Sequence, residues 1–108
     1  MIEQSKTSIV HPTAILEGAV VVGEGVEIGP FCHIIGPVTI GKNTTIASFS
    51  LIKGPVEIGE DNRINPHCII GTEPESKGES STGEITIGNC NIFTEFTVVT
   101  HGTMAPGT

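Results

Sequence analysis

Histidines are the first residues of this chain to consider for chemistry, because imidazole is the side chain whose ordinary titration spans neutral pH. The chain has four of them: His11, His33, His67 and His101. A zinc site of the carbonic-anhydrase kind needs three imidazoles that converge on one point. On the six-residue repeat of this chain, His33 and His67 occupy different positions, and neither shares a column with the other two. The spacing therefore predicts no three-histidine metal site.

A second polar cluster lies between residues 72 and 84, where Glu75, Ser76, Lys77 and Glu79 follow one another closely. The segment is polar and contains Pro and Gly, so it is predicted to be a loop. On these residues alone, Lys77, which lies between Glu75 and Glu79, is most simply a solvated charge in a flexible segment. A binding role for Lys77 needs a further argument.

The element that must position these side chains is a repeat with a period of six. A period of six fits neither an amphipathic helix, which repeats at 3.6 residues, nor a lone strand, which repeats at two. It is the period of a β-solenoid built from hexapeptides. Branched apolar residues mark every sixth position: Val10, Leu16, Val22, Ile28, Ile34, Ile40, Ile46, Ile52, Ile58, Ile64 and Ile70.

The neighbours of each marker predict a strand followed by a corner. Small or apolar residues, such as Cys32, Thr44 and Asn62, stand two positions earlier, and residues two apart on a strand face the same side, here inward. Asn62 is expected to form hydrogen bonds along its inward column. Glycines that tolerate positive φ are expected to turn the chain one residue after the marker. These are Gly23, Gly29, Gly41, Gly59 and Gly71.

A longer period of eighteen predicts three strands per coil. The pattern Val-x-(Val/Ile)-Gly begins at Val20, Val38 and Val56, each eighteen positions after the last, and its next occurrence begins at Ile85, later than this period allows. The excess spacing predicts one extruded loop. We therefore expect about five triangular coils, with coils at 10–27, 28–45 and 46–63 and markers resuming at 87, 93 and 99. Residues 1–9 are expected to lead into the first coil and shield its open edge.

Composition limits the possible partners and compartments. The net charge is −7 with only five basic residues, which argues against a nucleic-acid or anionic-membrane surface. No apolar run reaches eighteen residues, so no membrane span is predicted. The polar N-terminus lacks a secretory pattern, and the cysteine count of three is odd, which together favour the cytoplasm. Cys32 and Cys68 lie two coils apart, at ~10 Å, beyond disulfide reach.

Four segments, taken in order, resemble one family of acyltransferases. They are His-Pro-Thr-Ala-Ile from His11, Ile-Gly-Pro-Phe-Cys from Ile28, Ile-Gly-Glu-Asp-Asn-Arg-Ile from Ile58, and the Ile70-Gly71 pair that enters the polar loop. The chain resembles the acyl-carrier-protein-dependent UDP-N-acetylglucosamine O-acyltransferases of lipid A biosynthesis. The resemblance implies a left-handed parallel β-helix that forms homotrimers and a helical C-terminal domain. Residues 104–108 do not have the composition of a cap, so we expect this chain to lack the later coils and that domain.

The resemblance also implies an activity and its partners. Such enzymes move a hydroxyacyl chain from acyl carrier protein to the 3-hydroxyl of UDP-N-acetylglucosamine, in a cleft between subunits and without a cofactor. A histidine takes the proton from the sugar hydroxyl. In the family that histidine lies beyond the coils present here, so no catalytic or metal-binding residue is assigned and this chain alone is expected to be inactive.

The residues that the resemblance assigns to substrate binding are Glu75, Ser76, Lys77 and His101. The family has an Asp-x-Lys segment in the loop. Lys77 matches its Lys, Ser76 stands where its Asp would be, and one residue is deleted between them. His101 falls in the Arg position of a family His-Arg-Gly-Thr stretch. Because this carboxylate is missing, the sequence does not determine which sugar is the acceptor.

Two alternatives therefore remain from the sequence. The chain could acylate another nucleotide sugar, at oxygen or nitrogen, or it could be a β-solenoid scaffold without activity. An ice-binding surface needs a flat array of threonines. The outward residues of one face are Val21, Thr39, Glu57 and Thr86, which excludes that version of the scaffold.

Overall fold

Short parallel strands build the whole described part of the chain, which the computed structural model gives as residues 1–72 and 84–100. No helix occurs within these ranges, so none that could cross a membrane is found there. The strands are β1 Ile2–Gln4, β2 Ile9–Val10, β3 Ile15–Glu17, β4 Val20–Val22, β5 Glu27–Ile28, β6 His33–Ile35, β7 Val38–Ile40, β8 Thr45–Ile46, β9 Leu51–Lys53, β10 Val56–Ile58, β11 Arg63–Ile64, β12 Ile69–Thr72, β13 Ile85–Ile87, β14 Ile92–Phe93 and β15 Val98–Thr100.

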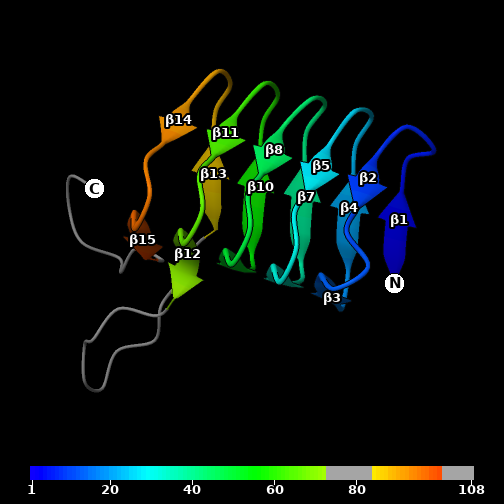
Figure 1. Ribbon diagram of the computed structural model, residues 1–108, viewed down its shortest axis with the longest axis horizontal. Helices are drawn as coiled ribbons and strands as arrows, with labels where there is room; N and C mark the ends of the chain where they lie inside the picture. The colour runs from blue at the N-terminus through cyan, green and yellow to red at the C-terminus, as the bar shows by residue number, and fades with distance from the viewer. Residues whose placement is uncertain (73–83, 101–108) are drawn as a thin grey trace.

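The strands form three five-stranded parallel sheets, which are the three walls of a solenoid (Figure 1). The sheet orders are β1-β4-β7-β10-β13, β14-β11-β8-β5-β2 and β15-β12-β9-β6-β3. Each coil therefore gives one strand to each wall. The predicted fold class, a left-handed parallel β-helix of about five triangular coils, is confirmed. β1 pairs with β4, so residues 1–9 already contribute a strand to the first wall.

Strand register confirms the period of eighteen and the insertion. Val20 pairs with Val38, Val38 with Val56, and Val56 with Ile85. The first two steps keep the period, whereas the last is longer, so an insertion separates β12 from β13. β13 nevertheless matches β10 position for position. The predicted loop at 72–84 lies at this insertion, but residues 73–83 are outside the described ranges.

The two inward columns form the core as predicted. Markers from Val22 to Ile70 expose 0 to 2% of their surface, and the positions two residues earlier, from Val20 to Cys68, are buried to the same degree. Burial weakens toward both ends of the described solenoid, where Val10, Leu16, Phe93 and Val99 are only partly buried. The core is therefore tightest in the middle coils.

The predicted reason for the corner glycines is wrong at four of the five positions. Among them only Gly71 has a positive φ, at 96°. The other glycines are needed because the next coil lies close: a Cβ on Gly41 would lie 2.5 Å from the Gly59 carbonyl oxygen, and one on Gly23 would lie 2.9 Å from that of Ile40. The left-handed corner residues come later in the repeat. They include Gly25, Phe31, Asn43, Phe49, Asp61, His67, Cys90 and Phe96.

The inward Asn62 hydrogen-bonds along its column, as predicted. Its Nδ2 donates to the Gly88 carbonyl at 2.7 Å, and its Oδ1 accepts from the Asn91 backbone N–H at 2.8 Å. On the preceding coil, the Thr44 hydroxyl donates to the Gly59 carbonyl at 2.8 Å. Buried polar groups are tolerated when they are paired in this way. Asn62 therefore joins the coil before the insertion to the coil after it.

We expect Ile46→Ala to lower the free energy of unfolding by roughly 2–5 kcal/mol, because it leaves a cavity in a close-packed core. Ile46 exposes 1% of its surface in the middle of the solenoid. Glu57→Ala is the control, since Glu57 is exposed at the centre of its own strand. Urea titration of both variants checks the result. Equal losses of stability would contradict the inward and outward assignments.

Candidate functional site

The four residues predicted to bind substrate, Glu75, Ser76, Lys77 and His101, lie outside the described ranges. The structure does describe the strands that lead to them. β12 ends at Thr72 and β15 ends at Thr100, and these two residues are register partners in neighbouring strands. The chain therefore enters both predicted segments from adjacent carboxyl ends of one sheet (Figure 1).

A column of stacked rings runs along the solenoid corner that precedes the strands of this sheet. Phe31 stacks on Phe49, with ring centroids 5.1 Å apart, Phe49 on His67 at 5.1 Å, and His67 on Phe96 at 5.3 Å. The planes are inclined by 16°, 2° and 13°. Such aromatic pairs stabilise by roughly 0.5–1.5 kcal/mol each beyond the area they bury. His67 therefore has a packing role at this corner.

Sequence reasoning missed this column although a signal was present. Positions 31, 49 and 67 keep the spacing of eighteen, and the step from 67 to 96 equals the lengthened step from Val56 to Ile85. The His67–Phe96 contact joins the coil before the insertion to the one after it. It complements Asn62, which makes the corresponding connection through hydrogen bonds.

His33 lies on the outward face of β6, where its Nε2 contacts Oε2 of Glu17 on β3. Their side chains are 39% and 56% exposed. A polar contact that is this open to water contributes little to stability. The pair has the character of a surface contact between neighbouring coils.

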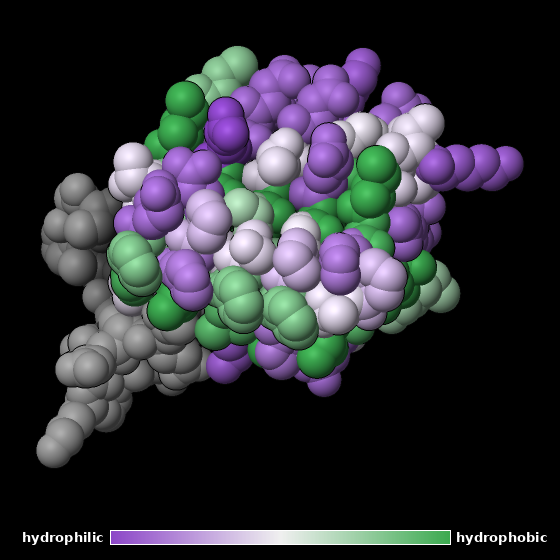
Figure 2. Space-filling model, viewed as in Figure 1, coloured by the Kyte–Doolittle hydropathy of each residue, from purple (hydrophilic) through white to green (hydrophobic). Residues whose placement is uncertain are grey.

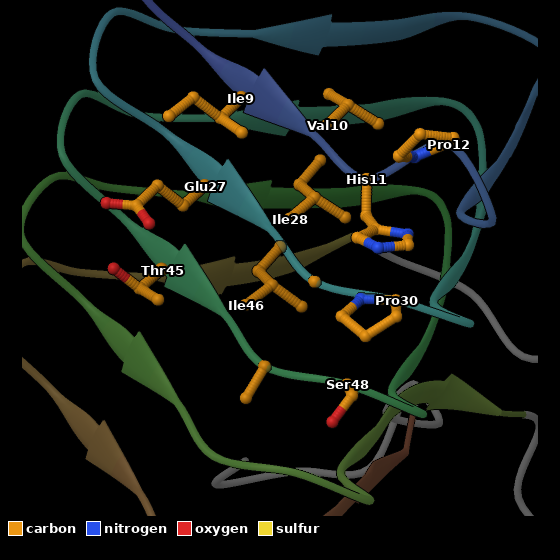
Figure 3. Close-up of a pocket in the computed structure, with 12 residues that line it drawn as sticks. Ile9, Val10, His11, Pro12, Glu27, Ile28, Pro30, Thr45, Ile46 and Ser48 are labelled. Carbon is orange, nitrogen blue, oxygen red and sulfur yellow. The ribbon is translucent and has the colours of Figure 1, made fainter.

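His11 lies at a groove on the outer face of β2, β5 and β8 (Figure 3). Its Nδ1 accepts a hydrogen bond from the Thr13 backbone N–H at 3.2 Å and lies 2.8 Å from the Thr13 hydroxyl. That hydroxyl oxygen accepts from the Phe31 N–H at 3.0 Å. Because Nδ1 is occupied as an acceptor, the neutral ring carries its proton on Nε2. His11 is therefore held in place by Thr13 at the edge of the groove.

The groove is a mostly apolar concavity of about 360 Å³. Figure 2 shows apolar side chains at the bottom of a hollow on this face, with polar ones around it. In Figure 3, Glu27 and Thr45 lie at the side away from His11. This separation leaves no acid–base pair inside the groove. Within the described residues, no three His, Cys, Asp or Glu side chains are grouped so that they could hold a metal ion.

Comparison with known proteins supplies the family. A model described as bacterial transferase hexapeptide (six repeats) matches residues 19–54 and 37–72. Together these matches cover residues 19–72, which is half of the chain. The chain belongs to this family of hexapeptide-repeat transferases.

Two of its curated relatives are acyl-[acyl-carrier-protein]–UDP-N-acetylglucosamine O-acyltransferases. The one from Sulfurovum is 50% identical over 93% of this chain, and the one from Brucella anthropi is 36% identical over 81%. The chain spans only 39% and 32% of their lengths, and it matches the N-terminal part. The family resemblance predicted from the sequence is confirmed.

Solved structures of two transferases agree with this chain in fold. The UDP-N-acetylglucosamine acyltransferase of Francisella novicida superposes with a TM-score of 0.66 at 30% identity, and covers 96% of this chain and 36% of that one. A perosamine N-acetyltransferase mutant from Caulobacter crescentus, in complex with CoA and GDP-perosamine, gives 0.61 at 15% identity, over 90% of this chain and 50% of that one. The second likeness concerns the fold alone.

The three cysteines of this hexapeptide-repeat chain differ in access to solvent. Cys32 and Cys68 are buried and Cys90 is exposed, and all three are free thiols. Burial raises the pKa of the Cys32 thiol, although nearby backbone hydrogen bonds oppose the shift. Its Sγ–H donates to the Ala47 carbonyl at 3.0 Å, and that of Cys68 donates to the Thr94 carbonyl at 3.2 Å.

We expect one fast-reacting thiol per folded chain at pH 8, because the thiolate is the reactive form and only Cys90 is exposed. Titration with a chromogenic disulfide reagent measures this, and Cys90→Ser should remove the fast phase. Cys32→Ser is the control that should leave the fast phase intact. A fast phase that survives Cys90→Ser would show that the core columns open readily.

Proposed function

We propose that this chain is the N-terminal β-helical part of an acyltransferase that moves a hydroxyacyl chain from acyl carrier protein to UDP-N-acetylglucosamine. One observation carries the proposal: the 50% identity over 93% of the chain to a curated enzyme of that name, which continues across the inserted segment. The Francisella structure, at 30% identity over 96% of the chain, supports it independently.

The contribution of this part is a rigid wall that holds two substrate-contacting segments. β12 and β15 are adjacent parallel strands within a sheet, and their last residues are paired. Lys77 follows the first strand and His101 follows the second. A lysine ammonium there can bind a phosphate or hydroxyl oxygen of the nucleotide sugar. No residue of this chain is assigned as the general base.

The proposed partners follow from the same activity. They are acyl carrier protein as donor, the UDP-sugar as acceptor and further copies of the chain in a homotrimer. The proposed location is the cytoplasm, and the proposed pathway is lipid A biosynthesis. The groove beside His11 is not assigned to either substrate, because its polar groups do not converge.

Of the alternatives, transfer to a different nucleotide sugar keeps the strongest support. Ser76 stands where the family has a carboxylate, so contacts with the acceptor differ in this chain. The scaffold reading has no observation in its favour beyond the fold itself, which is compatible with many functions.

The complete gene product that contains this chain should acylate UDP-N-acetylglucosamine with a hydroxyacyl-acyl carrier protein donor, and should sediment as a trimer. The 108-residue chain alone should show no turnover. Mass spectrometry of the products from a panel of UDP- and dTDP-sugars measures the turnover of both. Turnover only with an amino sugar would favour N-acylation, and no turnover with any sugar would favour the scaffold.

In the complete gene product, Lys77→Ala should raise the KM for the UDP-sugar by about tenfold or more, because a hydrogen bond to a charged group is worth roughly 1.5–3 kcal/mol. Lys42→Ala is the matched control, since Lys42 is an exposed lysine on a corner between β7 and β8. Initial rates at varied UDP-sugar concentration give the comparison. An unchanged KM for Lys77→Ala would make this lysine a solvated surface charge.

A further inference from the structure

Exposed apolar side chains gather around one corner of the solenoid. This corner joins the β2 wall (β2, β5, β8, β11 and β14) to the β3 wall (β3, β6, β9, β12 and β15). Figure 2 shows apolar side chains in the hollow of the visible face and in a row below it. In the described part of the chain, seven of the ten exposed large apolar residues lie on these two walls or at the corner, and they are 53 to 74% exposed. They are Ile9, Ile15, Phe31, Phe49, Ile92, Phe96 and Val98.

The area that these seven residues expose is large for a single chain. A side chain of this size exposes roughly 200 Å² when it is fully open, so the seven together leave roughly 800 Å² in contact with water. The largest apolar patch on a typical monomer is about 300–600 Å². One partner of a stable complex buries about 800 Å². The surface around this corner therefore has the size of an interface.

The two walls have complementary shapes at the same levels of the solenoid. On the β2 wall, Gly29 and Ala47 line the groove of about 360 Å³ and have no side chain beyond Cβ. On the β3 wall, the first residue of each strand faces outward, and His33 and Leu51 stand there on the same two coils. Large side chains on one wall therefore lie at the levels where the other wall is hollow.

A second copy of this chain is the partner that fits both walls. The rows on each wall repeat once per coil, every eighteen residues, and neighbouring coils lie roughly 4.8 Å apart. Another copy has this spacing along its whole length. The strands of each wall carry one acidic and one basic residue, so neither wall presents the single sign of charge that would select a strongly charged partner.

We propose that the β3 wall of one copy packs against the β2 wall of the next, with the corner between the two walls facing the common axis of the assembly. Leu51 of one copy then fills the groove beside Ala47 of its neighbour, and the rings of Phe31 and Phe49 are covered near the axis. The contact joins two different surfaces, and such contacts close into rings. The inference rests on the proposed function for the number of copies, which is three.

Sedimentation of the complete gene product tests this contact without requiring turnover. Leu51→Arg should raise the concentration at which the trimer dissociates by about a hundredfold or more, because its charge would be buried against an apolar neighbour. Ala47→Glu should have the same effect from the other wall. Val21→Arg is the matched control and should stay trimeric, since Val21 is 38% exposed on β4 of the third wall.

The double variant Ala47→Glu/Leu51→Arg identifies which walls meet. It places opposite charges across each contact, so its dissociation concentration should return to within about tenfold of that of the parent. A contact of the β3 wall with itself would instead oppose two arginines and give no return.

Three results would overturn the proposal: a single variant that stays as tightly trimeric as the parent, a Val21→Arg variant that dissociates equally, or a double variant no better than the single ones. Circular dichroism checks that each variant is folded. If the single variants do not fold, the double variant decides alone: a folded trimer supports the proposal, and any other result overturns it.

Assembly and activity are measured separately, so the two proposals can fail independently. A trimeric parent without turnover would contradict the proposed acyl transfer, while the variants would still decide the contact. A parent that sediments as a monomer would mean that another partner covers these walls, and would overturn the contact whatever its turnover.

Discussion

The stacking of each coil on the next in strict register is the constraint on which the rest of this structure depends. A parallel strand satisfies its backbone groups only through its neighbours, and here each neighbour is the same wall of the adjoining coil. Register fixes which side chains form a column. Because residues on a strand alternate between faces, a slip of one residue would expose the buried isoleucines. The core columns and the backbone ladders therefore specify the same arrangement.

Strict register also explains how the solenoid tolerates an insertion. The additional residues enter between a strand of one wall and a strand of the next, and the following coil resumes its pairing with β10 and β11. That coil has a weaker core, since Phe93 and Val99 are only partly buried. Side-chain connections compensate for this at two places: the amide of Asn62 bonds to the backbone at Gly88 and Asn91, and His67 stacks on Phe96.

The sequence was sufficient for the fold because the repeat is sampled many times. Ile28, Ile46 and Ile64 occupy the same inward position on successive coils, so the period does not depend on any single residue. The length of the insertion then follows from the distance between the repeats on either side of it. The corner geometry was less accessible. Glycine serves both close backbone approach and positive φ, and a sequence does not distinguish them. Gly41 requires glycine because the Gly59 carbonyl lies too close for a Cβ, whereas Gly71 requires it because its φ is positive.

The candidate site was less predictable than the fold, since it lies where the repeat is interrupted. Periodicity assigns a residue to a wall and a face only while the period holds, and Lys77 falls within the insertion. The structure relates its segment to that of His101 by pairing Thr72 with Thr100. Counting positions along the repeat would not pair Thr72 with Thr100, because the bulge at Gly71 shifts the register between β12 and β15 by one residue. The irregularity that sequence counting cannot detect lies at the last residues of β12, next to the point where the repeat is interrupted.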